Sequence, residues 1–110
     1  MLENLTKGKR SNVKVVFLKG LKEKSLGAIN KNSDAVFLIE TRFGIHTFFM
    51  YRLLDIVVLD RKGKIVKVRE SLKPNRLFFW HPRYSYIIEA PAGLIKELKL
   101  DLGNILRFSL

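Results

Sequence analysis

Hydrophobic residues in this chain recur mainly at every second position, which is the periodicity of β-strands. Over residues 12–18, Val13, Val15 and Phe17 alternate with Asn12, Lys14 and Val16, a pattern typical of a strand with one buried face. Residues 35–40, AVFLIE, are almost entirely apolar, which favours a strand buried on both faces. Further strands are predicted over residues 45–50, 53–60, 64–70, 84–89 and 104–110.

The clearest turn signal is the sequence Asp-Arg-Lys-Gly at residues 60–63, between two of these predicted strands. Gly63 can adopt the left-handed conformation that a type I turn followed by a bulge requires. After the turn, Ile65 and Val68 alternate with lysines and Arg69, as expected of a sheet with one solvent-exposed face. The pattern therefore predicts a β-hairpin here.

One short helix is predicted over residues 91–100. Leu94, Ile95 and Leu98 would share one face of it, and Pro91 would lie near its first turn, where the missing N–H costs least.

A second short helix is predicted around residues 20–29. Six or seven short strands with one or two short helices predict a mainly β fold, a single compact β-sandwich or barrel. We expect one domain over residues 1–110, with a core of about 11–110 and with residues 1–10 as a candidate flexible basic segment.

Composition narrows the class of protein. No apolar run approaches the roughly 18 residues of a membrane span, and the first ten residues lack the apolar segment of a secretory signal. We therefore expect a cytoplasmic protein without a membrane partner. The chain has no cysteine, which excludes disulfides, thiolate metal sites and a cysteine nucleophile. Abundant charged residues without any glutamine are typical of thermophilic, archaeal-like proteins.

Polar residues inside an apolar run mark the first candidate site. The run at residues 45–60, IHTFFMYRLLDIVVLD, contains His46, Thr47 and Asp55. A buried polar group is costly without a partner, and alternation places Asp55 on an apolar face of its strand. Two interpretations stay open. The first is a polar pocket, whose candidate lining residues are His46, Thr47, Asp55, Arg76 and Glu89. The second is an internal network, in which Asp55 accepts backbone N–H groups or pairs with Arg76.

A second candidate is the aromatic segment at residues 77–86, LFFWHPRYSY, where the periodicity of the strands is lost. It contains Trp80, His81, Arg83 and Tyr84. These side chains could close the open end of a sandwich, with Trp80 as a plug in the core. If these side chains are exposed, they could instead form the contact surface of a homodimer or stack on bases or sugars.

Charge and motifs leave three hypotheses about function. Twenty-one basic against ten acidic residues give a net charge of +11, which fits either polyanion binding or a solubilising surface. The two histidines lack ligand spacing, and neither G-x-S-x-G nor a glycine-rich phosphate loop occurs, so we expect no metal and no cofactor. We favour a binding module for a small ligand or protein partner. Nucleic-acid binding is the alternative, and an acid–base enzyme using Asp55 and His46 ranks last.

The order of several motifs resembles a known family. They are IHTFFM, then Asp55 in LLDIVVLD, then RKGKIVKV, then LKP followed by Arg76, then IIEAPAG. In this order they resemble domain-of-unknown-function family 192, a family of archaeal and bacterial proteins, from about residue 13 to residue 108. The resemblance implies a small, mainly β domain of jelly-roll-like topology and no established activity. The chain departs from the family pattern at Leu54, usually a proline, and at Asn104, usually an aspartate.

Overall fold

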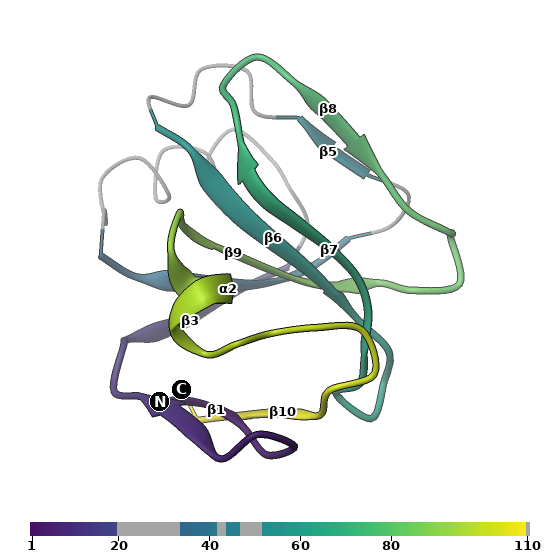
Figure 1. Cartoon of the computed structure of the whole chain (residues 1–110). Helices are drawn as coiled ribbons and strands as arrows, with labels where there is room; N and C mark the ends of the chain where they lie inside the picture. The colour runs from purple at the N-terminus through teal and green to yellow at the C-terminus, as the bar shows by residue number, and fades with distance from the viewer. Residues whose placement is uncertain (20–33, 42–43, 47–51, 110) are drawn as a thin grey trace.

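Strands dominate the computed structural model, which describes residues 1–19, 34–41, 44–46 and 52–109 (Figure 1). The helix predicted around residues 20–29 lies outside this part of the chain. The elements are β1 (Leu2–Asn4), β2 (Lys9–Ser11), β3 (Val15–Lys19), β4 (Val36–Glu40), β5 (Gly44–His46), β6 (Leu54–Leu59), β7 (Ile65–Leu72), β8 (Leu77–Phe79), β9 (Tyr86–Pro91), α2 (Leu94–Glu97) and β10 (Leu106–Phe108). The protein is mainly β.

The main sheet has five strands in the order β3-β4-β9-β6-β7. β3 pairs with β4 in parallel, and the other neighbours are antiparallel. All six residues of β6 are buried, as are the first four of β4. The AVFLIE segment is therefore a strand buried on both faces, as its sequence predicts.

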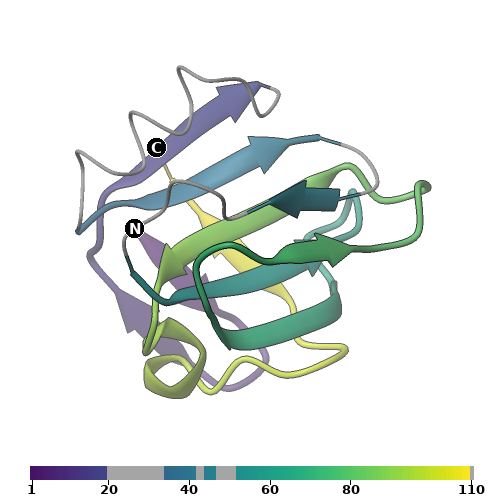
Figure 2. The ribbon, with the colours of Figure 1, turned by 90° about the horizontal axis from the view of Figure 1, so that it is seen from above.

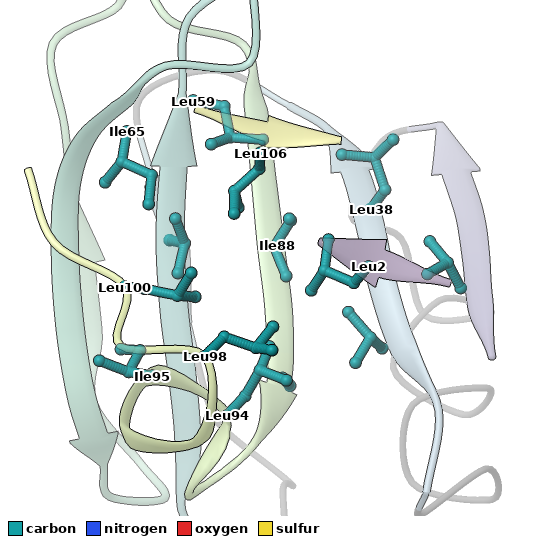
Figure 3. Packing of buried hydrophobic residues seen from close by; sticks show 14 residues of the cluster. Leu2, Leu38, Leu59, Ile65, Ile88, Leu94, Ile95, Leu98, Leu100 and Leu106 are labelled. Carbon is teal, nitrogen blue, oxygen red and sulfur yellow. The ribbon is translucent and has the colours of Figure 1, made fainter. Parts of the chain in front are cut away.

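Each face of the main sheet is covered by another layer (Figures 1 and 2). One face carries α2 and a three-stranded sheet of order β10-β1-β2, and we call the apolar cluster there the helix-side core. Figure 3 shows its side chains converging from both layers. Its members are Leu2, Val15, Val36, Leu38, Val57, Leu59, Ile65, Ile88, Ala90, Leu94, Ile95, Leu98, Leu100 and Leu106.

The opposite face of the main sheet packs against β8 of the two-stranded β5–β8 ribbon and against the aromatic segment. We call the cluster on this face the ribbon-side core. Its members are Ala35, Phe37, Ile39, Leu54, Ile56, Val58, Leu72, Phe78, Trp80 and Ile87. Because residues of β6 and β9 alternate between the two cores, neighbouring side chains in these strands have different surroundings.

The chain ends are part of the fold. Residues 1–10, set apart above as a candidate flexible segment, include β1, in which Leu2 and Asn4 are fully buried. The termini lie side by side in Figure 1, and the N–H of Ser109 donates to the carbonyl of Met1 at 2.9 Å. Among the described residues, no helix is long and apolar enough to cross a membrane.

Besides β1 and β2, which were not predicted as strands, two elements differ from the sequence-based expectation. α2 contains four residues, fewer than the segment 91–100 predicted as helical. β8 lies where no strand was predicted, because its exposed residues Leu77 and Phe79 are as apolar as the buried Phe78 between them, and this hides the alternation. The jelly-roll-like topology stays a prediction, since some connections between strands lie outside the described residues.

The hairpin at residues 60–63 forms as predicted. Gly63 has φ +83°, and its N–H donates to the Asp60 carbonyl at 3.1 Å. The Gly63 carbonyl accepts the N–H of Leu106 at 2.9 Å, so the turn also docks against β10. A Cβ atom at Gly63 would lie 2.6 Å from the Leu106 carbonyl oxygen.

Gly63→Ala should therefore lower the free energy of unfolding by more than the roughly 1–2 kcal/mol of left-handed strain alone. Gly8→Ala is the matched control, because Gly8 has φ +65° and open space around its Cβ position. Urea denaturation of both variants distinguishes the cost of left-handed strain, which both share, from the cost of the close contact with Leu106, which only Gly63→Ala has. Equal losses would contradict the close contact with Leu106.

Candidate functional site

Asp55 is a buried polar side chain that accepts three backbone hydrogen bonds. It is fully buried on the helix-side face of β6. Its Oδ1 accepts the N–H of Ser71 at 2.9 Å, and its Oδ2 accepts the N–H groups of Gly93 and Ile95, both at 3.0 Å. One carboxyl group thus connects β6, β7 and the start of α2. These contacts match the structural interpretation, in which Asp55 accepts backbone N–H groups.

The local backbone explains why an acid is needed at this position. Leu54 pairs with Leu72 and Ile56 pairs with Arg69, so β7 carries one extra residue opposite Asp55 and forms a bulge. The bulge removes regular ladder bonds, and the first N–H groups of a helix also lack partners. The N-cap residue of α2, a glycine, has no side chain to supply one. The carboxyl group of Asp55 satisfies donors of both kinds.

Asn4 plays a matching role at the other end of α2. It is fully buried, and its Nδ2 donates to the Leu98 carbonyl and to Asn104 Oδ1, both at 3.0 Å. Sequence reasoning missed Asn4, because it lies in a polar, charged segment that gives no sign of burial. Together, Asp55 and Asn4 hold a helix too short to be stable by itself.

Glu89 lies on the opposite face of the main sheet from Asp55. In β9 it is paired with Phe37 and Ile56, whose side chains belong to the ribbon-side core, and it is 3% exposed. Burial away from water raises its pKa from 4.5 to about 8. No hydrogen bond to its carboxyl group comes from the residues that the structure describes. Asp55 and Glu89 therefore lie in different environments, on opposite faces of the main sheet.

Of the remaining candidates of the polar cluster, the structure describes the backbone of His46 and the whole of Arg76. The backbone of His46 lies in β5, opposite Leu77 of the ribbon. Thr47 falls outside the described residues. Arg76 is exposed in the turn before β8, where its Nη1 lies 3.5 Å from the Asn75 carbonyl.

The aromatic segment divides into a buried and an exposed part. Trp80 belongs to the ribbon-side core, where its ring lies 6.0 Å from that of Phe78 and its Nε1 donates to the Tyr84 carbonyl at 2.8 Å. His81 and Arg83 are exposed, and the Arg83 N–H donates to His81 Nδ1 at 3.1 Å. Trp80 is thus a core residue, whereas its neighbours lie at the surface.

A pocket of about 500 Å³ lies at one end of the helix-side core, and we call it the end pocket. Five apolar or aromatic residues extend the core outward, and the hairpin at residues 60–63 supplies the polar lining. The described lining residues are Phe17, Leu38, Leu59, Asp60, Arg61, Gly63, Tyr86 and Phe108. Sequence reasoning missed this pocket, because its lining comes from segments far apart in the chain.

The electrostatics of the end pocket depend on its hairpin. Asp60 Oδ1 accepts the N–H groups of Lys62 and Lys64, both at 2.9 Å, so one of its two oxygens is engaged in the turn. The Arg61 side chain is exposed at the same turn. The pocket therefore combines an apolar, aromatic wall with a carboxylate and an exposed cation at the hairpin. A smaller pocket of about 280 Å³ lies beside the turn that precedes α2.

Residues 6–108 match the family described as "Uncharacterized ACR", DUF192. The chain belongs to the DUF192 family. This confirms the resemblance seen in the motifs. A UPF0127 protein of Pyrococcus furiosus is 29% identical over 112 residues, which cover 96% of each chain. Another, of Thermococcus kodakarensis, is 35% identical over 117 residues, covering 99% of this chain and 73% of that one.

A solved structure shows the same fold as this DUF192 chain. A crystal structure from Sinorhizobium meliloti, provisionally named a transcription regulator, superposes with a TM-score of 0.78 at 18% identity, covering 96% of this chain and 88% of that one. At this identity the similarity concerns the fold alone. The DUF192 chain is a conserved protein of unknown function, so any activity must be argued from its own residues.

Replacing Asp55 tests its structural role. Asp55→Asn places an amide NH₂ group against backbone donors and should lower the free energy of unfolding by about 2–4 kcal/mol. Asp34→Asn, at an exposed aspartate, is the control and should change little. Urea denaturation of both variants measures the difference. A stability loss no larger than that of the control would contradict the anchoring role.

Glu89 predicts a pH dependence of stability. Its folded-state pKa of about 8 exceeds the ordinary 4.5, so the folded protein keeps a proton that the unfolded chain releases between these values. The stability that this retained proton provides is fully present below about pH 4.5. It is lost as the pH rises to about 8, and the free energy of unfolding falls by roughly 1.4 kcal/mol per pH unit in this range.

Glu89→Gln should remove this pH dependence, because glutamine mimics the protonated acid and does not titrate. Glu97→Gln, at an exposed glutamate of α2, should keep the wild-type dependence. Denaturation midpoints between about pH 5 and about pH 8 provide the comparison. Parallel curves for wild type and Glu89→Gln would show that Glu89 ionises freely in the folded state.

Proposed function

We propose that this DUF192 protein is a small-ligand-binding module whose site is the end pocket. The observation that carries the proposal is the pocket itself, about 500 Å³ in volume and continuous with the helix-side core. Ligand sites in proteins are typically about 300–1,000 Å³, mostly apolar, and supplied with a few polar groups. The end pocket has this composition.

The lining indicates the chemistry of the ligand. Phe17, Tyr86 and Phe108 offer aromatic faces, which favour a flat or bulky apolar body. Arg61 offers a guanidinium group, which binds a carboxylate or another anion through paired hydrogen bonds. The ligand we propose is an amphipathic organic anion, with its apolar part against the aromatic residues and its charge at Arg61.

The position of the pocket supports this role. Phe17, Leu38, Tyr86 and Leu59 come from four neighbouring strands of the main sheet, and Phe108 comes from the facing sheet. Where two packed sheets diverge, side chains no longer meet across the gap, and a jelly-roll-like topology would create such an opening. A ligand there would complete the apolar contacts that the core leaves open.

Naphthoate and its uncharged analogue naphthol are suitable probes, because they share an aromatic body and differ in charge. Calorimetric titration should show naphthoate binding that Arg61→Gln weakens about tenfold, with little effect on naphthol. Phe17→Ala should weaken both probes, since Phe17 is 41% exposed and its truncation leaves the core intact.

Arg10→Gln is the matched control, because Arg10 is an exposed arginine of β2 outside the pocket lining. Amide chemical shifts during the titration locate the bound probe. Shift changes away from the hairpin and β3, or equal weakening by Arg10→Gln and Arg61→Gln, would contradict the assignment of the end pocket.

A further inference from the structure

The outer surface of β8 exposes two large apolar side chains that the core does not use. Leu77 and Phe79 are 57% and 60% exposed, whereas Phe78 between them is buried in the ribbon-side core. Alternation along the strand places Leu77 and Phe79 together on the side facing away from the main sheet. We call this pair the β8 outer face.

Positive charge lies beside β8. Lys67 of β7 donates from Nζ to the Phe79 carbonyl at 2.7 Å and lies 4.9 Å from the centre of the Phe78 ring, so β7 runs next to β8. Arg69, two residues further along β7, is also exposed. Residues 65–76, which include all of β7, contain four basic residues and one acidic residue.

A second cationic and aromatic group follows β8. The guanidinium carbon of Arg83 lies 5.9 Å from the centre of the Tyr84 ring, and the exposed His81 packs edge-on against the same ring at 6.3 Å. Arginine and lysine residues thus precede β8 in the sequence, lie on β7 beside it, and follow it in the sequence.

An exposed aromatic ring among cations is complementary to a nucleic acid whose bases are unpaired. Phosphates pair with lysine and arginine, while a base can stack on an aromatic side chain only when it is free of its own helix. We propose that the β8 outer face binds single-stranded nucleic acid, with a base stacked on Phe79 and phosphates at Arg69 and Arg83. This inference is independent of the end pocket.

The experiment is fluorescence anisotropy with a labelled single strand of about 12 nucleotides, which spans a typical site, and with its duplex. Wild-type protein should bind the single strand more tightly than the duplex. Affinity should fall with added salt, at a logarithmic slope of about 0.7 for each phosphate neutralised.

Phe79→Ala should weaken single-strand binding about tenfold or more, and Phe79→Trp should retain it. Leu102→Ala, which truncates an equally exposed apolar residue outside the surface, is the control. Arg69→Gln should reduce the salt slope by about 0.7, whereas Arg10→Gln should leave it unchanged. Thermal unfolding of each variant verifies that the fold is intact.

Three outcomes would overturn the proposal: equal affinities of wild type and Phe79→Ala, a preference for the duplex, or loss of affinity in Arg10→Gln as large as in Arg69→Gln. Sedimentation of wild type and Phe79→Ala at matched concentrations adds a fourth. A dimer that dissociates on Phe79→Ala would assign the β8 outer face to a second copy of the chain.

Discussion

The arrangement of the main sheet and α2 depends on one buried carboxyl group, that of Asp55. Its two oxygens accept three backbone N–H groups from β7 and from the start of α2, none of which has a regular secondary-structure partner. An unsatisfied buried donor costs about 1–3 kcal/mol, so the bulge and the short helix are both costly without this acid. α2 and its C-cap residue in turn supply Leu94, Ile95 and Leu98 to the helix-side core. One polar interaction therefore determines where a large apolar surface is buried.

Sequence patterns predicted the elements in which the buried positions are apolar and the exposed positions are polar. The AVFLIE strand and the hairpin at Gly63 are of this kind, because apolar periodicity and turn chemistry act locally. β8 was missed, since its exposed and buried positions are equally apolar. β1 was missed as well, because the burial of Leu2 and Asn4 comes from pairing with β10, more than a hundred residues away in the sequence. Local pattern carries no information about such long-range contacts.

The candidate site was harder to predict for the same reason. Sequence identified Asp55 and Glu89 as polar residues in apolar strands, and both are buried. It could not show that they point to opposite faces, because this requires the pairing register of β6 with β9. The end pocket has no local signature at all. Its residues are individually ordinary, and only the closure of one sheet over another brings Phe17 and Phe108 to the same opening.

The end pocket and the β8 outer face lie on opposite sides of the main sheet, yet both use the segment from the hairpin to β7. Arg61 lines the end pocket, Lys67 contacts β8, and Arg69 is exposed on the same strand as Lys67. Communication between two sites requires an element with two arrangements that each ligand biases differently. The hairpin is held to β10 through the Gly63 carbonyl and has no space for a Cβ atom there, and β7 is held by Asp55 at its far end. A segment fixed at both ends favours two sites that bind independently of each other.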